Sequence, residues 1–207
     1  MIADYAIYIT AFVTLFVIID PFGLAPLFVA LTQGEDARHR RNIALRSCAI
    51  GAFLLTLFGL FGEALLGFVG ISMPAFRIAG GILLFLTALD MLFERRTKRR
   101  EDQSAGANDP SVFPLATPLI AGPGAMATMI LLVGQSPNDW AWIAAVHLVM
   151  VLVLCVTLIF FLAAGVLEHL LGPTGINVVT RLLGMLLAAL SVQFVLDGLR
   201  AFGLAQI

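Results

Sequence analysis

Two short motifs place proline and glycine inside long apolar stretches of the sequence. They read Asp20-Pro21-Phe22-Gly23 and Gly122-Pro123-Gly124. Proline lacks an N–H and clashes with the preceding helical turn, so a helix that reaches either motif must break or bend there. In both motifs a residue of a helix-capping type comes directly before proline, which is the order found where a helix begins. Each motif therefore predicts the start of a new half-helix.

The two predicted helix starts differ in chemistry at the residue before proline. A helix start presents unpaired N–H groups and a positive dipole end, which favour an anion such as a carboxylate. Gly122 leaves these donors uncapped, whereas Asp20 adds a carboxylate that attracts an ammonium group or a coupling cation. The pair suits a zwitterion with a small side chain. The plainer interpretation is that Asp20 only caps its own helix, but an acid inside a membrane span is a functional candidate by default.

The elements that carry these motifs are expected to be membrane-spanning helices. Of the 207 residues, 60% are hydrophobic and 12% are charged, which is too few charges to solvate a soluble globule. A bilayer core of roughly 30 Å needs about 20 apolar residues per helix. Suitable segments lie at residues 6–31, 44–69, 73–93, 112–133, 140–165 and 179–203. They are continuously apolar, which favours an all-α membrane protein with six transmembrane helices over a β-barrel.

Residues typical of helix N-caps precede three of these segments. Ser72 comes before the third segment, Asp139 before the fifth and Asn177 before the sixth. The first segment has no basic residues before it and no small-residue cleavage pattern after it, so we expect a retained span and not a signal peptide. With this segment kept, the two motifs lie near the centres of spans one and four.

Clustered basic residues predict the orientation of the chain. Residues 38–46 and 95–100 hold nine of the twelve basic residues. Lys and Arg in short loops prefer the cytoplasm, and both clusters fall on one side if the chain crosses at every segment. Both termini are then outside, and the predicted loop at residues 168–177 is inside. The polar stretch 95–111 is expected to be a cytoplasmic linker between a first unit, 1–94, and a second unit, 112–207, within one membrane domain.

The two units resemble each other in sequence. Arg77, Gly80 and Thr87 of the third span match Arg181, Gly184 and Ser191 of the sixth, and the proline motifs match between spans one and four. Each unit contains three crossings, and an odd number forces the second unit to enter from the opposite face. The pattern therefore predicts two inverted three-helix repeats, with spans one and four broken at Pro and Gly, an architecture typical of transporters.

Other polar residues are weaker candidates. Thr117 and Thr128 flank the second motif and could supply hydroxyls, although threonines commonly bond back to their own helix. Arg77 and Arg181 could gate a path or could extend to the membrane interface. Gln193 could face the interior.

Two further pairs of residues have side chains that could do chemistry. Glu63 and His147 lie at similar distances from the outer surface and could pair, although two separately hydrated groups are the commoner arrangement. Cys48 and Cys155 lie inside apolar runs, with no CxxC motif, and are interpreted as small core residues.

The combined motifs resemble those of the MarC family of bacterial six-span inner-membrane proteins. The resemblance rests on Asp20-Pro21-Phe22-Gly23, Pro26, Leu31-Thr32, Gly70-Ile71-Ser72-Met73-Pro74, Arg77-Ile78-Ala79-Gly80-Gly81, Pro114-Leu115-Ala116, Pro118, Ala121-Gly122-Pro123-Gly124, Arg181-Leu182, Gly184 and Val192-Gln193-Phe194. It implies an inner-membrane location, termini outside, a relation to lysine exporters and, as for some members, transport of small neutral amino acids. Some members carry Asn where this chain carries Asp20, so a coupling mechanism need not transfer.

The sequence thus predicts a secondary transporter with a small-molecule substrate and the lipid bilayer as its partners. The predicted substrate site comprises Asp20, Pro21, Phe22, Gly23, Gly122, Pro123, Gly124, Thr117 and Thr128. A proton or sodium ion could be coupled, and no cofactor, metal site, enzyme activity or nucleic-acid partner is expected. Two alternatives stay open. A cation or metabolite exporter would want more oxygen ligands at mid-membrane than Asp20, and a membrane electron carrier or enzyme would want cysteines at the breaks.

Overall fold

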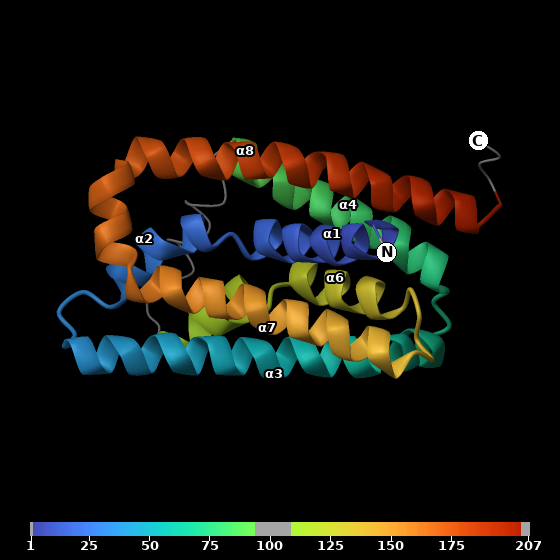
Figure 1. Ribbon diagram of the computed structural model, residues 1–207, viewed down its shortest axis with the longest axis horizontal. Helices are drawn as coiled ribbons and strands as arrows, with labels where there is room; N and C mark the ends of the chain where they lie inside the picture. Colours follow the sequence, from blue (N-terminus) through green and yellow to red (C-terminus); the bar gives the residue numbers. More distant parts are fainter. Residues whose placement is uncertain (1, 94–108, 204–207) are drawn as a thin grey trace.

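The computed structural model describes residues 2–93 and 109–203, and within these ranges it contains helices and no strands (Figure 1). Most of the predicted linker 95–111, up to residue 108, lies outside the described residues. The helices are α1 (Ile2–Ile19), α2 (Pro21–Leu31), α3 (Ala37–Val69), α4 (Met73–Leu92), η1 (Ser111–Ile120), α6 (Pro123–Val133), α7 (Trp140–Leu162) and α8 (Ala164–Ala201). Five helices of the described chain are long and apolar enough to cross a membrane, or six if the bent pair η1–α6 counts as one span. The protein is therefore all-helical, as predicted.

Side-chain caps define where several helices begin. The prediction of caps at Ser72 and Asp139 is confirmed, because the Ala75 N–H donates to Ser72 Oγ and two N–H groups of α7 donate to Asp139. Asp36 caps α3 by accepting from the His39 N–H at 2.6 Å, so this helix begins before the predicted segment 44–69. The basic residues of its first turns extend the helix beyond the apolar run.

The predicted cap at Asn177 and loop at residues 168–177 are wrong. α8 is helical from Ala164 to Ala201 and changes direction at Gly172, whose φ of 61° is open to glycine. Apolar residues on both sides of Gly172 continue the helix, and the change of direction at this glycine takes the place of the predicted loop. The first part of α8 crosses one end of the bundle in Figure 1.

Two antiparallel helix pairs form the outer layers of the molecule. α4 and α8 approach closely at glycines: a Cβ at Gly81 would meet Ser191 O at 2.8 Å, and one at Gly198 would meet Pro74 O at 3.1 Å. On the opposite side α3 runs against α7, where Gly59 lies under His147. The direction of each pair is visible in Figure 1. Glycine therefore allows these helices to pack closely.

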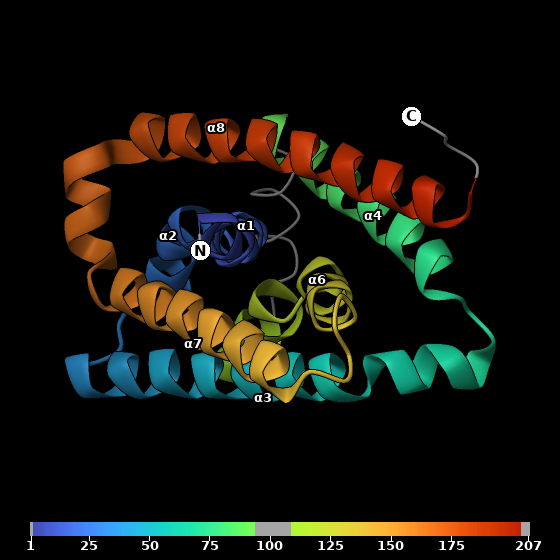
Figure 2. The same ribbon diagram turned by 45° about the vertical axis from the view of Figure 1, so that its right-hand side comes forward.

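The interrupted helices α1, α2 and α6 fill the space between these two layers (Figure 2). In the span Ile7–Leu31, 61% of the most apolar window is buried, against 22% in α3. Residues 127–133 of α6 are all buried as well. The unbroken helices therefore face outward, and the helices that carry Asp20 and Gly122 form the core.

The two ends of the bundle differ in charge. The end of α2, the start of α3 and the start of η1 meet at one end, which we call the basic end because it carries Arg38, Arg40, Arg41 and Arg46. The start of α1 and the end of α8 both point toward the opposite end (Figure 1). A polar pocket lies at the basic end and is described below.

Candidate functional site

Asp20 forms the junction between α1 and α2. Its N–H donates to Phe16 O at 2.9 Å and its carbonyl accepts from Leu24 N at 3.0 Å, so its backbone belongs to both helices. This requires a left-handed conformation, with φ 56° and ψ 67°. The side chain is fully buried, and Oδ1 accepts from the Gly23 N–H at 3.1 Å. Asp20 thus caps α2 from within the protein core.

The junction between η1 and α6 differs from the first because no side chain caps the helix that follows it. Gly122 is extended and supplies no side-chain cap, and the two segments are bent by 53°. The helix itself provides no acceptor for the N–H groups of Gly124 and Ala125, because both lie in its first turn. A Cβ at Gly122 would collide with Pro118 O, which explains why glycine occupies the position.

The half preceding this junction is irregular, which the sequence analysis did not anticipate. η1 contains non-helical backbone at Phe113 and Thr117, and its bonds from Leu115 N to Pro110 O and from Ala121 N to Ala116 O span five residues. Each irregular residue precedes a proline, Pro114 or Pro118. The two prolines within one predicted span could have indicated this irregularity, because the residue before a proline is disfavoured in helical geometry.

The two junctions lie next to each other in the core. A Cβ at Gly124 would meet Ile18 Cδ1 at 2.8 Å, so the last turn of α1 contacts the first turn of α6. Asp20 lies near the middle of Ile7–Leu31, and Gly122 lies near the middle of the bent pair Ser111–Ile120 and Pro123–Val133. A carboxylate and a set of backbone donors are therefore close together at mid-span.

The threonines differ in how they meet this region. Thr128 lies one turn beyond Gly124 on the face that contacts α1, and it is fully buried. Its Oγ1 has no hydrogen-bond partner among the described residues. At the matching level of α1, the buried Thr14 donates to Thr10 O at 2.7 Å. Thr117 is half-buried in the irregular part of η1.

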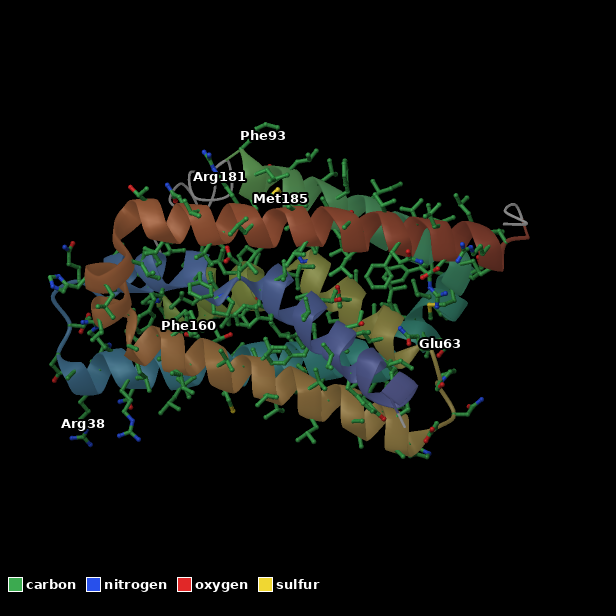
Figure 3. The ribbon with its side chains drawn as sticks, turned by 45° about the horizontal axis from the view of Figure 1, so that its top comes forward. Arg38, Glu63, Phe93, Phe160, Arg181 and Met185 are labelled. Carbon is green, nitrogen blue, oxygen red and sulfur yellow. The ribbon has the colours of Figure 1, made fainter. Side chains whose placement is uncertain are left out.

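The remaining motif residues surround the junctions without all facing inward. Pro21 is buried, Gly23 is half-buried and Pro123 is exposed. Phe22 packs edge-on against Phe160 of α7, with ring centroids 4.6 Å apart, and Figure 3 shows Phe160 inside the bundle. Phe22 therefore belongs to an aromatic cluster between α2 and α7.

The candidate gating residues lie on the outer helices α4 and α8. Arg77 is half-buried near the start of α4, and Arg181 is exposed beside Phe93 at the end of α4 (Figure 3). Gln193 is exposed and donates to Asp197 Oδ1 at 2.8 Å, one turn along α8. The structure does not bring these three side chains to the junctions.

Glu63 and His147 do not form a hydrogen bond or ion pair in the described part of the chain. His147 Nδ1 bonds to Ile143 O at 2.8 Å, its Nε2 is buried without a hydrogen-bond partner in the same residues, and Glu63 is exposed (Figure 3). Cys48 is buried and Cys155 is exposed, and both thiols are free. No three His, Cys, Asp or Glu side chains within residues 2–93 and 109–203 are grouped to hold a metal ion.

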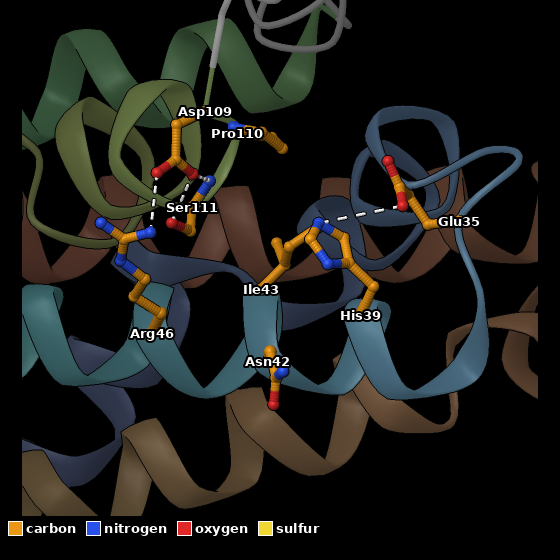
Figure 4. Close-up of a pocket in the computed structure, with 8 residues that line it drawn as sticks. All are labelled: Glu35, His39, Asn42, Ile43, Arg46, Asp109, Pro110 and Ser111. Carbon is orange, nitrogen blue, oxygen red and sulfur yellow. Dashed lines mark hydrogen bonds and ion pairs between the residues drawn. The ribbon is translucent and has the colours of Figure 1, made fainter.

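A polar pocket at the basic end was missed by the sequence analysis. It has a volume of about 330 Å³, and Figure 4 shows its lining: Glu35, His39, Asn42, Ile43, Arg46, Asp109, Pro110 and Ser111. The residues come from two segments that are far apart in sequence, so no local spacing marks them. What these residues share in the sequence is that they are mostly polar and lie near the starts of two predicted spans, which both begin on the same side of the membrane.

An ion pair joins the two segments across this pocket. Arg46 Nη1 lies 2.8 Å from Asp109 Oδ2, and Asp109 Oδ1 accepts from the Ser111 hydroxyl at 2.6 Å and the Ser111 N–H at 3.0 Å. The hydrogen bond from the Ser111 hydroxyl, with smaller help from the Ser111 N–H and Arg46, lowers the pKa of Asp109. On the other side of the pocket His39 lies 3.8 Å from Glu35.

Known proteins resemble this chain along nearly its whole length. Residues 5–202 match the family described as MarC family integral membrane protein. A UPF0056 membrane protein of Methanocaldococcus jannaschii is 37% identical over 201 residues, covering 95% of this chain and 98% of the relative. The UPF0056 inner membrane protein YhgN of Escherichia coli is 36% identical over 194 residues, covering 93% and 95%. No solved structure matches.

Proposed function

The chain belongs to the MarC family of integral membrane proteins, and from this premise we propose that it is a secondary transporter of small neutral amino acids. In this proposal the substrate binds between the start of α2 at Asp20 and the start of α6 at Gly122. The basic end faces the cytoplasm, both termini face outward, and the location is the inner membrane, as in the E. coli relative. A relation to lysine exporters belongs to the same proposal.

One observation carries the proposal: two interrupted helices lie next to each other in the core at mid-span. Broken backbone is tolerated at membrane depth where it is buried in protein or lines a cavity. Here the breaks hold a buried carboxylate at Asp20 and the first-turn N–H groups of Gly124 and Ala125, for which α6 itself provides no acceptor and Gly122 no side-chain cap. Discontinuous helices of this kind bind substrates and coupling ions in secondary transporters.

The packing of the helices supports two inverted repeats. If α1–α2, α3 and α4 are exchanged with η1–α6, α7 and α8, the main contacts are preserved. α2 packs on α7 and α8, and its counterpart α6 packs on α3 and α4. The pairs α3–α7 and α4–α8 are antiparallel, as required for matched helices that enter from opposite faces.

The chemistry of the two junctions favours a zwitterion with a small side chain. Backbone donors at the start of α6 suit its carboxylate, and Asp20 suits its ammonium group or a coupled proton or sodium ion. Ile18 packs directly on Gly124, so there is little room beyond the charged groups. Glycine, alanine and serine fit this description better than larger amino acids.

Transport by the purified protein in liposomes tests the proposal. Labelled glycine, alanine and serine would be offered with and without sodium and pH gradients, with tryptophan as the bulky comparison and protein-free liposomes as the control. We expect uptake of at least one small amino acid that unlabelled alanine competes away. Equal counts in protein-containing and protein-free liposomes for all three would overturn the proposal.

A further inference from the structure

The pocket at the basic end lies where the two proposed repeats meet. Its walls are the start of α3, from the first repeat, and the start of η1, from the second (Figure 4). Ile43 is buried beneath the opening, with 5% of its surface exposed. Arg46, Asp109 and Ser111 lie on one side of Ile43, and Glu35 and His39 lie on the other. The pocket thus presents charges of both signs above an apolar floor.

We propose that this pocket is the cytoplasmic mouth of the transport path, closed by the Arg46–Asp109 ion pair, and that Arg46 receives the carboxylate of an arriving amino acid in place of Asp109. The inference rests on the proposed transport function. It assigns a second ligand site, distinct from the junctions at Asp20 and Gly122, whose ligand class is a zwitterionic amino acid.

The Arg46–Asp109 ion pair is weak enough to be broken and formed again as the pocket opens and closes. Its side chains are 62% and 40% exposed, and exposed ion pairs contribute little stability, so a competing carboxylate can displace one partner. Asp109 would keep its bonds from the Ser111 hydroxyl and N–H after losing Arg46. The bonds between Asp109 and the first residue of η1 are therefore kept while the ion pair between the two repeats is broken.

The volume and lining of the pocket agree with this ligand class. A volume of about 330 Å³ is at the small end of ligand pockets. Arg46 offers a planar pair of donors that matches a carboxylate, and Glu35 lies across the pocket for an ammonium group.

The opposite end of the bundle is closed by a different contact. Under the exchange of repeats, α3 and η1 correspond to α7 and α1, and these helices meet there through Tyr8 and Trp142, whose ring centroids are 5.6 Å apart. The Trp142 Nε1–H also donates to Leu132 O at 2.8 Å. An aromatic contact contains no ion pair that the carboxylate of a ligand could displace, so we assign carboxylate-driven opening to the basic end.

Thiol labelling tests the closure without any need for transport. Both native cysteines are replaced by alanine, and Ile43→Cys provides a reporter under the pocket in inverted membrane vesicles. Arg46→Gln and Asp109→Asn should each speed its reaction with an impermeant maleimide by about two- to fivefold, the range that an exposed ion pair supports. The swap Arg46→Asp with Asp109→Arg should return the rate to that of the parent.

The matched control is Arg38→Gln, which removes the same charge from the same helix. Arg38 does not line the pocket and points away from the bundle in Figure 3, so the labelling rate should be unchanged. Unchanged rates in both Arg46→Gln and Asp109→Asn would overturn the closure. Asp109→Asn keeps a capping oxygen for Ser111, and Arg46→Lys keeps the charge, so a loss of folding can be recognised.

The half-saturation concentration for alanine transport from the cytoplasmic face shows whether Arg46 binds the carboxylate of the substrate or only forms an ion pair with Asp109. If Arg46 binds the carboxylate, Arg46→Gln should raise this concentration about tenfold or more, and Asp109→Asn should lower it because Arg46 is released for the ligand. Shifts in the same direction would overturn the role of Arg46 as a carboxylate partner. If the parent transports none of the small amino acids, the proposed function fails, while labelling still decides the closure.

Discussion

Asp20 combines three properties that are rarely found together in one side chain. It is fully buried, it caps α2, and its backbone is left-handed. Asn and Asp tolerate this conformation better than other residues with a Cβ, and glycine tolerates it freely. Its chemistry and its backbone can therefore be changed separately by substitution.

We predict that Asp20→Asn nearly preserves thermal stability in detergent but strongly reduces amino acid uptake. The amide can still cap Gly23 and adopt the left-handed conformation, whereas the negative charge is lost. Asp20→Gly should keep the left-handed backbone and lose the side-chain cap, at a cost of only about 0.3 kcal/mol, because glycine is itself tolerated at a helix N-cap. Asp20→Ala should cost about 2 to 3 kcal/mol, because left-handed strain is added to the lost cap. Uptake by Asp20→Asn equal to that of the parent across pH and sodium conditions would sink the charge-based mechanism.

Thr128 offers a second test at the same scale, with Thr14 as its control. Thr128→Val removes a buried hydroxyl that has no hydrogen-bond partner among the described residues, so stability should be unchanged or raised by about 1 kcal/mol. Uptake should fall if the hydroxyl contacts the substrate. Thr14→Val removes a hydroxyl already bonded to Thr10 O and should leave uptake near the parent value. Equal uptake by both variants would remove Thr128 from the site.

The position of Asp20 and its capping role could be predicted from the sequence, but its left-handed backbone could not. Caps are usually extended, and the order of residues at Asp20-Pro21 is the same for either conformation. The left-handed form arises because one residue closes α1 and opens α2, a requirement that depends on how the two helices are packed. The lack of a hydrogen-bond partner for Thr128 Oγ1 among the described residues likewise depends on how the core packs and could not be predicted from the sequence.

At the scale of the elements, the seam between α4 and α8 depends on glycine. Gly81→Ala should destabilise the protein by about 1 to 3 kcal/mol, because the new Cβ would press on the backbone oxygen of Ser191, which cannot rotate away. Thermal unfolding in detergent measures the effect.

Gly67→Ala is the matched control for this substitution. Gly67 lies within α3 with open space around it, and alanine there should be neutral or stabilising by up to about 1 kcal/mol. A larger loss of stability for Gly67→Ala than for Gly81→Ala would contradict the close α4–α8 contact.

The length of the apolar runs predicted most of the helices correctly. The predictions were wrong where the backbone conformation depends on contacts between helices. Ser72 and Asp139 marked helix starts correctly because their capping bonds are local. Asn177 is not a cap because the part of α8 that follows the break at Gly172 already begins at Thr174, so a cap-type residue before an apolar run here lies within a helix. The pocket lined by Arg46 and Asp109 could not be predicted from the sequence, because only the folded protein brings these two residues together.

At the scale of the whole molecule, the orientation in the membrane remains a prediction from charge. In a background without native cysteines, Arg38→Cys should react with an impermeant maleimide only from the cytoplasmic side, and Asn138→Cys only from outside. Both positions are exposed, at the basic end and before α7 respectively. Reaction of the two thiols from one side would contradict the span arrangement, and the reverse pattern would overturn the assignment of the basic end to the cytoplasm.

The length of α3 indicates that the proposed cytoplasmic mouth and the proposed site at Asp20 lie in different media. Its 33 residues span about 50 Å at 1.5 Å per residue, well beyond a hydrocarbon core of roughly 30 Å. The first turns of α3, with Arg46, therefore stand in water, where mobile ions screen exposed charges within a Debye length of about 8 Å at physiological ionic strength. The carboxylate of Asp20 is shielded from those ions by the surrounding core. Raising the salt concentration should loosen the proposed cytoplasmic mouth and leave the proposed site at Asp20 unaffected, so in the proposed transport cycle ionic strength would act on the entry of substrate and not on its binding at mid-membrane.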